Sequence, residues 1–237
     1  NGDLAALDFR GELLWSRNVG PLEINYGHSS SLTTWRNLLL LELDLGPGEN
    51  ARPRLLALNA ASGKPAWMIP RPEIVTWASP IVIRREAGDQ LITVTNPYVF
   101  GNDPATGREI WRAKLLGGDV APSPAWDGKH VYAAMDRHGL FAVDPGAEGE
   151  IAPDQVAWKA EEGAGEVVSP LAFGGYVYAA DDGGKLICYR ADDGELLWRG
   201  GQRGKYEASP TLVGGECIYW GDEKGVVYVF AAGGAEN

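Results

Sequence analysis

Residues 98–111 read YVFGNDPATGREIW, and versions of this phrase recur along the chain. The clearest copies are GDLAALDFRGELLW at 2–15, RLLALNAASGKPAW at 54–67 and KLICYRADDGELLW at 185–198. In a fifth copy, GLFAVD at 139–144, an insertion delays the closing tryptophan, and a sixth copy, GVVYVF at 225–230, has no closing tryptophan. Self-similarity at a fixed period is the sequence signature of a repeat architecture.

Two markers keep these copies in register. The first is the closing tryptophan, which occurs at Trp15, Trp67, Trp111, Trp158 and Trp198, with spacings of 52, 44, 47 and 40 residues. The second is a serine 11 to 14 residues later, at Ser29, Ser79, Ser123, Ser169 and Ser209, and proline follows the last four. The two markers agree on a period of about 44 residues.

Each repeat predicts four antiparallel strands. In the repeat that begins with LAF at 171–173, a Gly174-Gly175 turn leads to YVYAA at 176–180. This alternation of apolar and small side chains is typical of a half-buried strand. Turns with Asp first and Gly fourth, such as 181–184, precede the third strand, as a type I turn closed by a residue at positive φ requires. A short fourth strand ends near the tryptophan.

Four-stranded units of this length, with no helical periodicity, indicate the blades of a β-propeller. We therefore predict an all-β protein in which residues 1–237 form a single propeller domain of five to six blades, or a fragment of one. The count is 21 strands, because the chain begins and ends at a third strand. Either residues 12–15 complete the last blade beside 226–230, or the chain is part of a larger ring, which we favour. Insertions at 46–53 and 145–155 fall between strands.

The composition argues against several classes of function. Asp and Glu total 32 against 21 Lys and Arg, a net charge of -11 that repels a phosphate backbone, so we expect no nucleic-acid partner. The longest apolar run, residues 38–41, is far too short for a transmembrane segment. Cys188 and Cys217 suit neither a disulfide framework nor a zinc site. No signal-peptide pattern follows Asn1.

The repeated phrase carries a family resemblance. Asp103, Thr106, Gly107 and Trp111 complete the pattern Asp-x-x-Thr-Gly-x-x-x-Trp. With the Ser-Pro strands, this pattern resembles the pyrroloquinoline-quinone-type repeat of quinoprotein alcohol dehydrogenases and of the propeller lipoprotein in the outer-membrane protein assembly machinery. The resemblance implies about eight blades in a ring and a periplasmic or otherwise extracytoplasmic location in a bacterial cell envelope. It does not choose between enzyme and scaffold, because one fold serves both.

Functional residues of a propeller gather on one face, in the loops from each outer strand to the next inner strand and in the neighbouring turns. These loops are acidic and aromatic here. We predict an interaction rim made of Glu23, Tyr26, His28, Glu73, Trp77, Asp119, His138, Glu166, Tyr206 and Glu207. Asp136, Asp182 and Asp222 join it from the turns, and a solvated acidic surface with no binding role is the alternative.

The tryptophans divide into two groups. The five closing tryptophans are expected to join neighbouring blades, since an indole buries about 200 Å². The other four lie near inner strands, where a ring could face the central channel: Trp35, Trp77, Trp126 and Trp220.

The function predicted from these features is a non-catalytic scaffold for protein–protein interaction, with no catalytic residue, metal or cofactor. Its protein partner is unidentified, and an exposed edge strand could bind an extended peptide. One alternative is a dehydrogenase that binds pyrroloquinoline quinone with Ca²⁺. Against it, the rim has few Arg and Lys for the cofactor's carboxylates, and Cys188 and Cys217 are 29 residues apart where such dehydrogenases have adjacent cysteines. The other alternative is a carbohydrate-binding propeller that stacks sugars on Trp77, Tyr26 and Tyr206.

Overall fold

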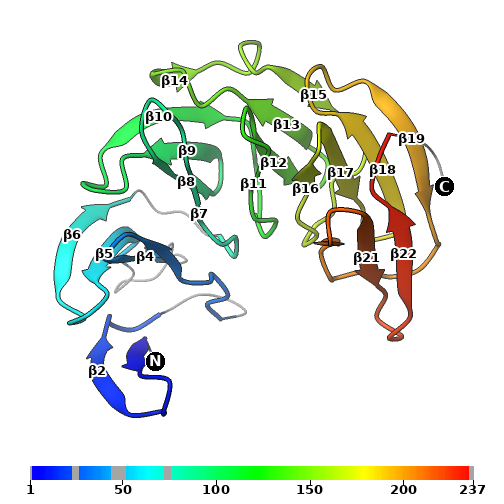
Figure 1. The fold of residues 1–237 in the computed structure, drawn as a ribbon. Coiled ribbons are helices and arrows are strands. Elements are labelled where there is room, and N and C mark those ends of the chain that lie inside the picture. The colour runs from blue at the N-terminus through cyan, green and yellow to red at the C-terminus, as the bar shows by residue number, and fades with distance from the viewer. Residues whose placement is uncertain (1, 23–26, 44–51, 72–75, 235–237) are drawn as a thin grey trace.

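The computed structural model of the protein describes residues 2–22, 27–43, 52–71 and 76–234. Six β-sheets follow one another around an open arc, with the inner strands on the concave side (Figure 1). Among the described residues there is no helix long and apolar enough to cross a membrane. The predicted all-β propeller architecture is confirmed.

Four of the sheets are complete blades. Blade I consists of β3 (Thr33–Trp35), β4 (Leu38–Leu43), β5 (Arg54–Asn59) and β6 (Pro65–Pro70). Blade II consists of β7 (Ile81–Ile83), β8 (Gln90–Val94), β9 (Tyr98–Asn102) and β10 (Glu109–Lys114). Blade III consists of β11 (Ala125–Trp126), β12 (Val131–Met135), β13 (Gly139–Val143) and β15 (Trp158–Ala160). Blade IV consists of β16 (Leu171–Phe173), β17 (Tyr176–Ala180), β18 (Lys185–Arg190) and β19 (Leu196–Gly201).

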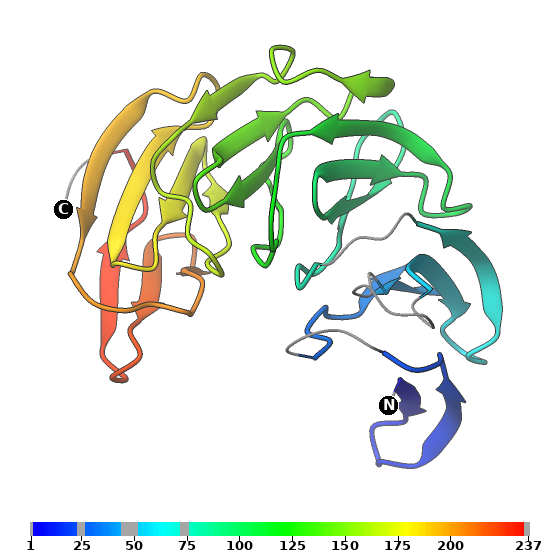
Figure 2. The same cartoon turned by 180° about the vertical axis from the view of Figure 1, so that it is seen from behind.

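The two ends of the arc are partial blades. The N-terminal unit pairs β1 (Asp3–Leu7) with β2 (Leu13–Asn18), and the C-terminal unit pairs β20 (Thr211–Val213), β21 (Cys217–Gly221) and β22 (Val227–Ala231). These units lie at opposite ends of the arc in both views (Figures 1 and 2). The predicted alternative in which residues 12–15 complete the last blade is therefore wrong, because β2 pairs with β1 and not with β22.

One strand was not predicted. The insertion at 145–155 contains β14 (Gly149–Ile151), which leaves blade III and adds to blade II as a parallel neighbour of β10. An ion pair of 2.9 Å between Arg112 Nη2 and Glu150 Oε2 joins the two strands. Residues 44–51, which include most of the other insertion, lie outside the described residues.

The serine marker forms a chain of hydrogen bonds from blade to blade. The backbone N–H of Ser79 donates to the hydroxyl oxygen of Ser123 in the next blade, at 2.9 Å. The same 2.9 Å bond joins Ser31 to Ser79, Ser123 to Ser169 and Ser169 to Ser209. Each of these serines lies two residues before the first strand of its blade. The spacing predicted Ser29 as the marker of the first blade, but the structure shows that Ser31 takes this position.

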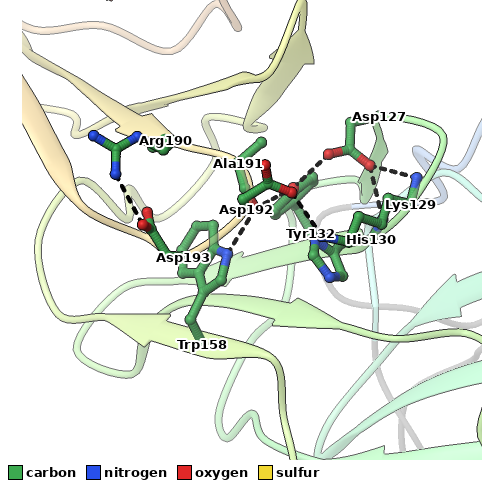
Figure 3. Close-up of polar contacts among 9 residues, drawn as sticks. All are labelled: Asp127, Lys129, His130, Tyr132, Trp158, Arg190, Ala191, Asp192 and Asp193. Carbon is green, nitrogen blue, oxygen red and sulfur yellow. Dashed lines mark hydrogen bonds and ion pairs between the residues drawn. The ribbon is translucent and has the colours of Figure 1, made fainter.

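Four of the closing tryptophans, Trp15, Trp67, Trp158 and Trp198, link neighbouring units at their outer edge, as predicted. Trp111 is the exception, because its Nε1 donates to Gln90 Oε1 and its ring lies against Gly101, both in its own blade. Trp158 Nε1 donates to the carbonyl of Ala191 in the next blade, at 2.8 Å (Figure 3). Its ring lies against Gly194, where an added Cβ would be 2.7 Å from the indole. Trp15 and Trp67 pack in the same way on Gly63 and Gly107. A glycine is therefore required in the turn that receives each of these rings.

Further polar contacts support the junction between blades III and IV. The hydroxyl of Tyr132 donates to Asp127 Oδ2 at 2.7 Å and lies 3.2 Å from the carbonyl oxygen of Ala191. Lys129 Nζ lies 2.6 Å from Asp192 Oδ1 (Figure 3). Burial and the Asp127 carboxylate raise the pKa of Tyr132 far above its usual value. Asp192 thus forms an exposed ion pair across the junction between blades III and IV.

Candidate functional site

Four successive loops that connect outer to inner strands meet in one part of the predicted rim. Two adjoining pockets lie there. The first, of about 380 Å³, is lined by Ser29, Trp77, Asp119, Ala121, Glu166 and Val167. The second, of about 610 Å³, is lined by Gly117, Gly118, Asp119, Met135, Asp136, Arg137, His138 and Glu166. Asp119 and Glu166 border both pockets, so the two form one continuous surface, which we call the rim site.

Trp77 is fixed by contacts with the loops on both sides. Its backbone N–H donates to the carbonyl of Val120 at 2.8 Å, and its indole Nε1 donates to the carbonyl of Gly27 at 3.1 Å. The hydroxyl of Ser29 donates to the Trp77 carbonyl at 2.9 Å. Because these bonds come from separate loops, the half-buried indole is held in place by the assembly of the blades.

The acidic side of the rim site is held by a turn of blade IV. Asp182 Oδ2 accepts the backbone N–H of Glu166 at 2.7 Å, and the carbonyl of Asp182 accepts the N–H of Tyr206 at 3.1 Å. Asp182 thus supports the two loops that contain Glu166 and Tyr206. The side chains of Asp119, Glu166 and Val167 are exposed.

The turn between β12 and β13 adds the only histidine among the residues that line the two pockets. His138 Nδ1 donates to the carbonyl of Asp136 at 3.1 Å, and Arg137 Nε lies 3.1 Å from Asp136 Oδ2. Arg137 has a positive φ of 63°, which the turn imposes. The Arg137 side chain is 89% exposed, so its charge is largely screened by water.

Several predicted rim residues lie elsewhere. Tyr206 is fully buried, its ring stacked 4.0 Å from that of Trp220, and burial raises the pKa of Tyr206 to about 12. It belongs to the core and cannot offer its ring to a partner. Glu207 is exposed and pairs with Lys205 at 2.7 Å, which lowers the pKa of Glu207. Glu23, Tyr26 and Glu73 lie outside the described residues.

The structure therefore brings Trp77, Asp119, His138 and Glu166 together, with His28 half-buried in the loop that contains Ser29. Sequence reasoning missed the apolar part of the site, above all Val167, which is 38% exposed. Of the four tryptophans near inner strands, Trp77 alone lines these two pockets. Trp220 is buried, and its Nε1 donates to the carbonyl of Ala208.

The rim site combines an apolar wall with carboxylates. The indole of Trp77 and the side chains of Ala121 and Val167 form the wall, and Asp119 and Glu166 flank it. Such a pocket suits an aliphatic stem that ends in a positive charge, because the stem gains apolar contact while the charge remains near the carboxylates. In the described ranges, no three His, Cys, Asp or Glu side chains cluster as metal ligands.

Comparisons with known proteins agree with the fold. The family model described as outer membrane protein assembly factor BamB matches residues 149–236. A search of curated protein sequences gave no significant match. These findings and the structural matches below confirm the predicted resemblance to propellers of the pyrroloquinoline-quinone-type repeat.

Three solved structures share the fold at low sequence identity. BamB from Moraxella catarrhalis matches with a TM-score of 0.74 and 16% identity, over 96% of this chain and 66% of that chain. A europium-containing methanol dehydrogenase matches with a TM-score of 0.71 and 13% identity, over 98% and 66%. The quinohemoprotein alcohol dehydrogenase from Comamonas testosteroni matches with a TM-score of 0.51 and 13% identity, over 100% and 65%. The chain thus spans about two thirds of the length of each.

Proposed function

We propose that this chain is a non-catalytic propeller scaffold that binds a protein partner through the rim site, in an extracytoplasmic compartment of a bacterial cell envelope. The observation that carries the proposal is the preorganised pocket between Trp77 and Val167 with Asp119 and Glu166 beside it. A rigid surface loses little conformational entropy on binding, so a shallow pocket of this kind can support a useful affinity. The likeness of residues 149–236 to the BamB family model supports the envelope location.

The partner's contact segment carries an aliphatic or basic side chain in this proposal. An aliphatic stem covers the Trp77 indole, and a lysine or arginine head group pairs with Asp119 and Glu166. The net charge of -11 adds an attraction for a basic partner that weakens as salt rises.

Site-specific photo-crosslinking in cells tests the proposal. A photoreactive phenylalanine analogue at Val167 should give one dominant protein adduct, and the same analogue at exposed Arg199 on the outer strand β19 serves as the control position. We expect Asp119→Lys to remove the Val167 adduct, because it reverses a charge beside the pocket. The proposal fails when no protein is crosslinked from Val167, or when both positions give the same products.

A second candidate function is a dehydrogenase that binds pyrroloquinoline quinone with Ca²⁺, since two dehydrogenases share the fold. The described rim site fits that cofactor poorly, because its charged side chains are Asp119, Asp136 and Glu166 against one arginine, Arg137, which is paired with Asp136. A cofactor with several carboxylates would be repelled there. Titration with the quinone and Ca²⁺ separates the candidates: an enzyme gains thermal stability on binding, and the proposed scaffold does not. The carbohydrate-binding alternative is weakened, because the buried ring of Tyr206 cannot stack on a sugar.

A further inference from the structure

The face opposite the rim site carries a separate pocket, of about 520 Å³. Turns of three successive blades converge on it: the β3–β4 and β7–β8 turns, the β9–β10 turn, and the segment that follows β13. Its volume lies within the range of roughly 300–1,000 Å³ that is usual for small-molecule sites. Three arginines line it, from three different turns: Arg36, Arg85 and Arg108.

These arginines differ from those of the protein that form ion pairs. Arg112, Arg190 and Arg199 each pair with a carboxylate. Within the described part of the chain, Arg36, Arg85 and Arg108 have no carboxylate at ion-pair distance, although acidic residues outnumber basic ones in the sequence. Arg85 donates to the carbonyl of Pro145, and the Arg36 guanidinium lies 4.4 Å from the centre of the Trp35 ring. Most of their N–H donors are therefore available to a ligand.

The carboxylates of the pocket are mostly engaged by uncharged donors. Asp89 Oδ2 accepts the Trp35 indole N–H at 2.7 Å. Asp103 accepts the backbone N–H of Ala105 at 2.8 Å and the hydroxyl of Thr106 at 2.9 Å, within its own turn. Glu148 is exposed at the border of the pocket. The acidic groups thus leave the three guanidiniums without a direct counterion.

The backbone at Arg36 adds an independent observation. Arg36 has a φ of 52°, a left-handed conformation that costs a residue with a side chain roughly 1–2 kcal/mol. The equivalent turns of blade IV and of the C-terminal unit have glycines there, Gly174-Gly175 and Gly214-Gly215. An arginine in this position is unfavourable for the turn itself, and strained residues of this kind are concentrated at functional sites.

We propose that this pocket binds an anionic ligand through its oxyanion groups, which Arg36, Arg85 and Arg108 clamp together. Carboxylate and phosphate share the required chemistry, because a guanidinium presents paired N–H donors that match two oxygens of either group. Trp35 holds the Arg36 guanidinium by stacking, and Glu148 weakens binding by its like charge. The pocket acts independently of the rim site.

The test uses citrate as the carboxylate probe and pyrophosphate as the phosphate probe, with ionic strength held constant by sodium chloride. Binding is followed by calorimetry and by the NMR signal of the Trp35 indole N–H, which Trp35→Phe assigns. We expect saturable binding of at least one probe and a shift of that signal. Preference for one probe identifies the oxyanion of the natural ligand.

Two variants give opposite predictions. Arg36→Gly should preserve or raise the melting temperature, since glycine suits the positive φ, but weaken probe binding about tenfold or more, the usual cost of a lost hydrogen bond to a charged group. Glu148→Gln should tighten binding. Arg203→Gln, an exposed arginine outside the pocket, should change neither. The proposal is overturned when neither probe shifts the Trp35 signal at concentrations up to ~10 mM, where even a millimolar site would be mostly occupied. It is also overturned when Arg36→Gly and Arg203→Gln have equal effects.

Discussion

Replacement of Gly194 by alanine tests how strongly a tryptophan joins two blades. Gly194 has a φ of 73°, and an added Cβ would lie 2.7 Å from the ring of Trp158 in the neighbouring blade. Gly174, in the same blade, has a φ of 63° and nothing within 4 Å of an added Cβ. The two substitutions therefore share the backbone strain, and only one of them collides with the indole.

The expected magnitudes follow from these two contributions. A left-handed alanine costs roughly 1–2 kcal/mol, which applies to both variants. Overpacking against a buried ring costs about 1–3 kcal/mol more, which applies to Gly194→Ala alone. The difference of about 1–3 kcal/mol corresponds to about 2–12 °C in melting temperature for a domain of this size.

Equilibrium unfolding in urea, followed by tryptophan fluorescence and by circular dichroism, measures both variants. We expect Gly194→Ala to have the lower midpoint of the two, with an unchanged slope in urea, since the surface exposed on unfolding stays the same. Equal midpoints for Gly194→Ala and Gly174→Ala would refute the argument that the ring of Trp158 requires a glycine. A changed slope would instead show that the blades no longer unfold together.

Three further predictions concern stability. Glu42 and Arg71 form a buried ion pair of 3.3 Å, with side chains 0% and 5% exposed, so Arg71→Met should lower the free energy of unfolding by about 3–5 kcal/mol. Glu42→Leu added to Arg71→Met should restore part of that loss, because it removes a buried carboxylate that has lost the Arg71 guanidinium; a larger loss in the double variant contradicts this. Ser123→Ala removes the acceptor of the Ser79 N–H and should lower the free energy of unfolding in urea by about 1–3 kcal/mol. An unchanged urea midpoint would mean that the hydrogen bonds between the serines add no stability. Burial raises the pKa of Tyr189 to about 12 from an unfolded value of about 10, so the stability that neutral Tyr189 contributes is complete below pH 10 and is lost as the pH rises towards 12. Between pH 8 and pH 12 the urea midpoint of Tyr189→Phe should therefore fall less steeply than that of the unmodified protein, and parallel curves would refute the assignment.

The sequence predicted the strands well because their signals are local. Alternating side chains and Asp-led turns are contained within a few residues, and all 21 strands that the repeat implied are present in the described structure. The strand β14 has no such local signal. It has three residues, and it exists because β10 offers a free edge and Arg112 pairs with Glu150. A partner 38 residues away in the chain cannot be recognised from three residues.

The rim site was predicted in part for a similar reason. Trp77, Asp119 and Glu166 occupy equivalent loops of successive repeats, so a correct register was enough to bring them together. Tyr206 also lies in such a loop, but its burial depends on other segments. Gly184 has no side chain, and an added Cβ there would lie 2.5 Å from the Tyr206 ring, so the space for this ring is created by a turn that precedes it in the chain. Nothing in the loop sequence itself distinguishes a buried tyrosine from an exposed one.

Blades I and II, and likewise blades III and IV, are joined at two separated places, and this determines how the rim site is held. The serine bonds lie in the loops on the rim side, near the inner strands, whereas the tryptophans contact the turns between third and fourth strands, near the outer edge. One junction alone would allow two blades to rotate about it, but two junctions at different radii resist that rotation. Trp77 depends on this arrangement, because its hydrogen bonds reach Gly27 in one loop and Val120 in another. The position of the indole is therefore a property of three adjacent repeats, and its geometry is set by residues such as Ser79 and Ser123 that touch no ligand.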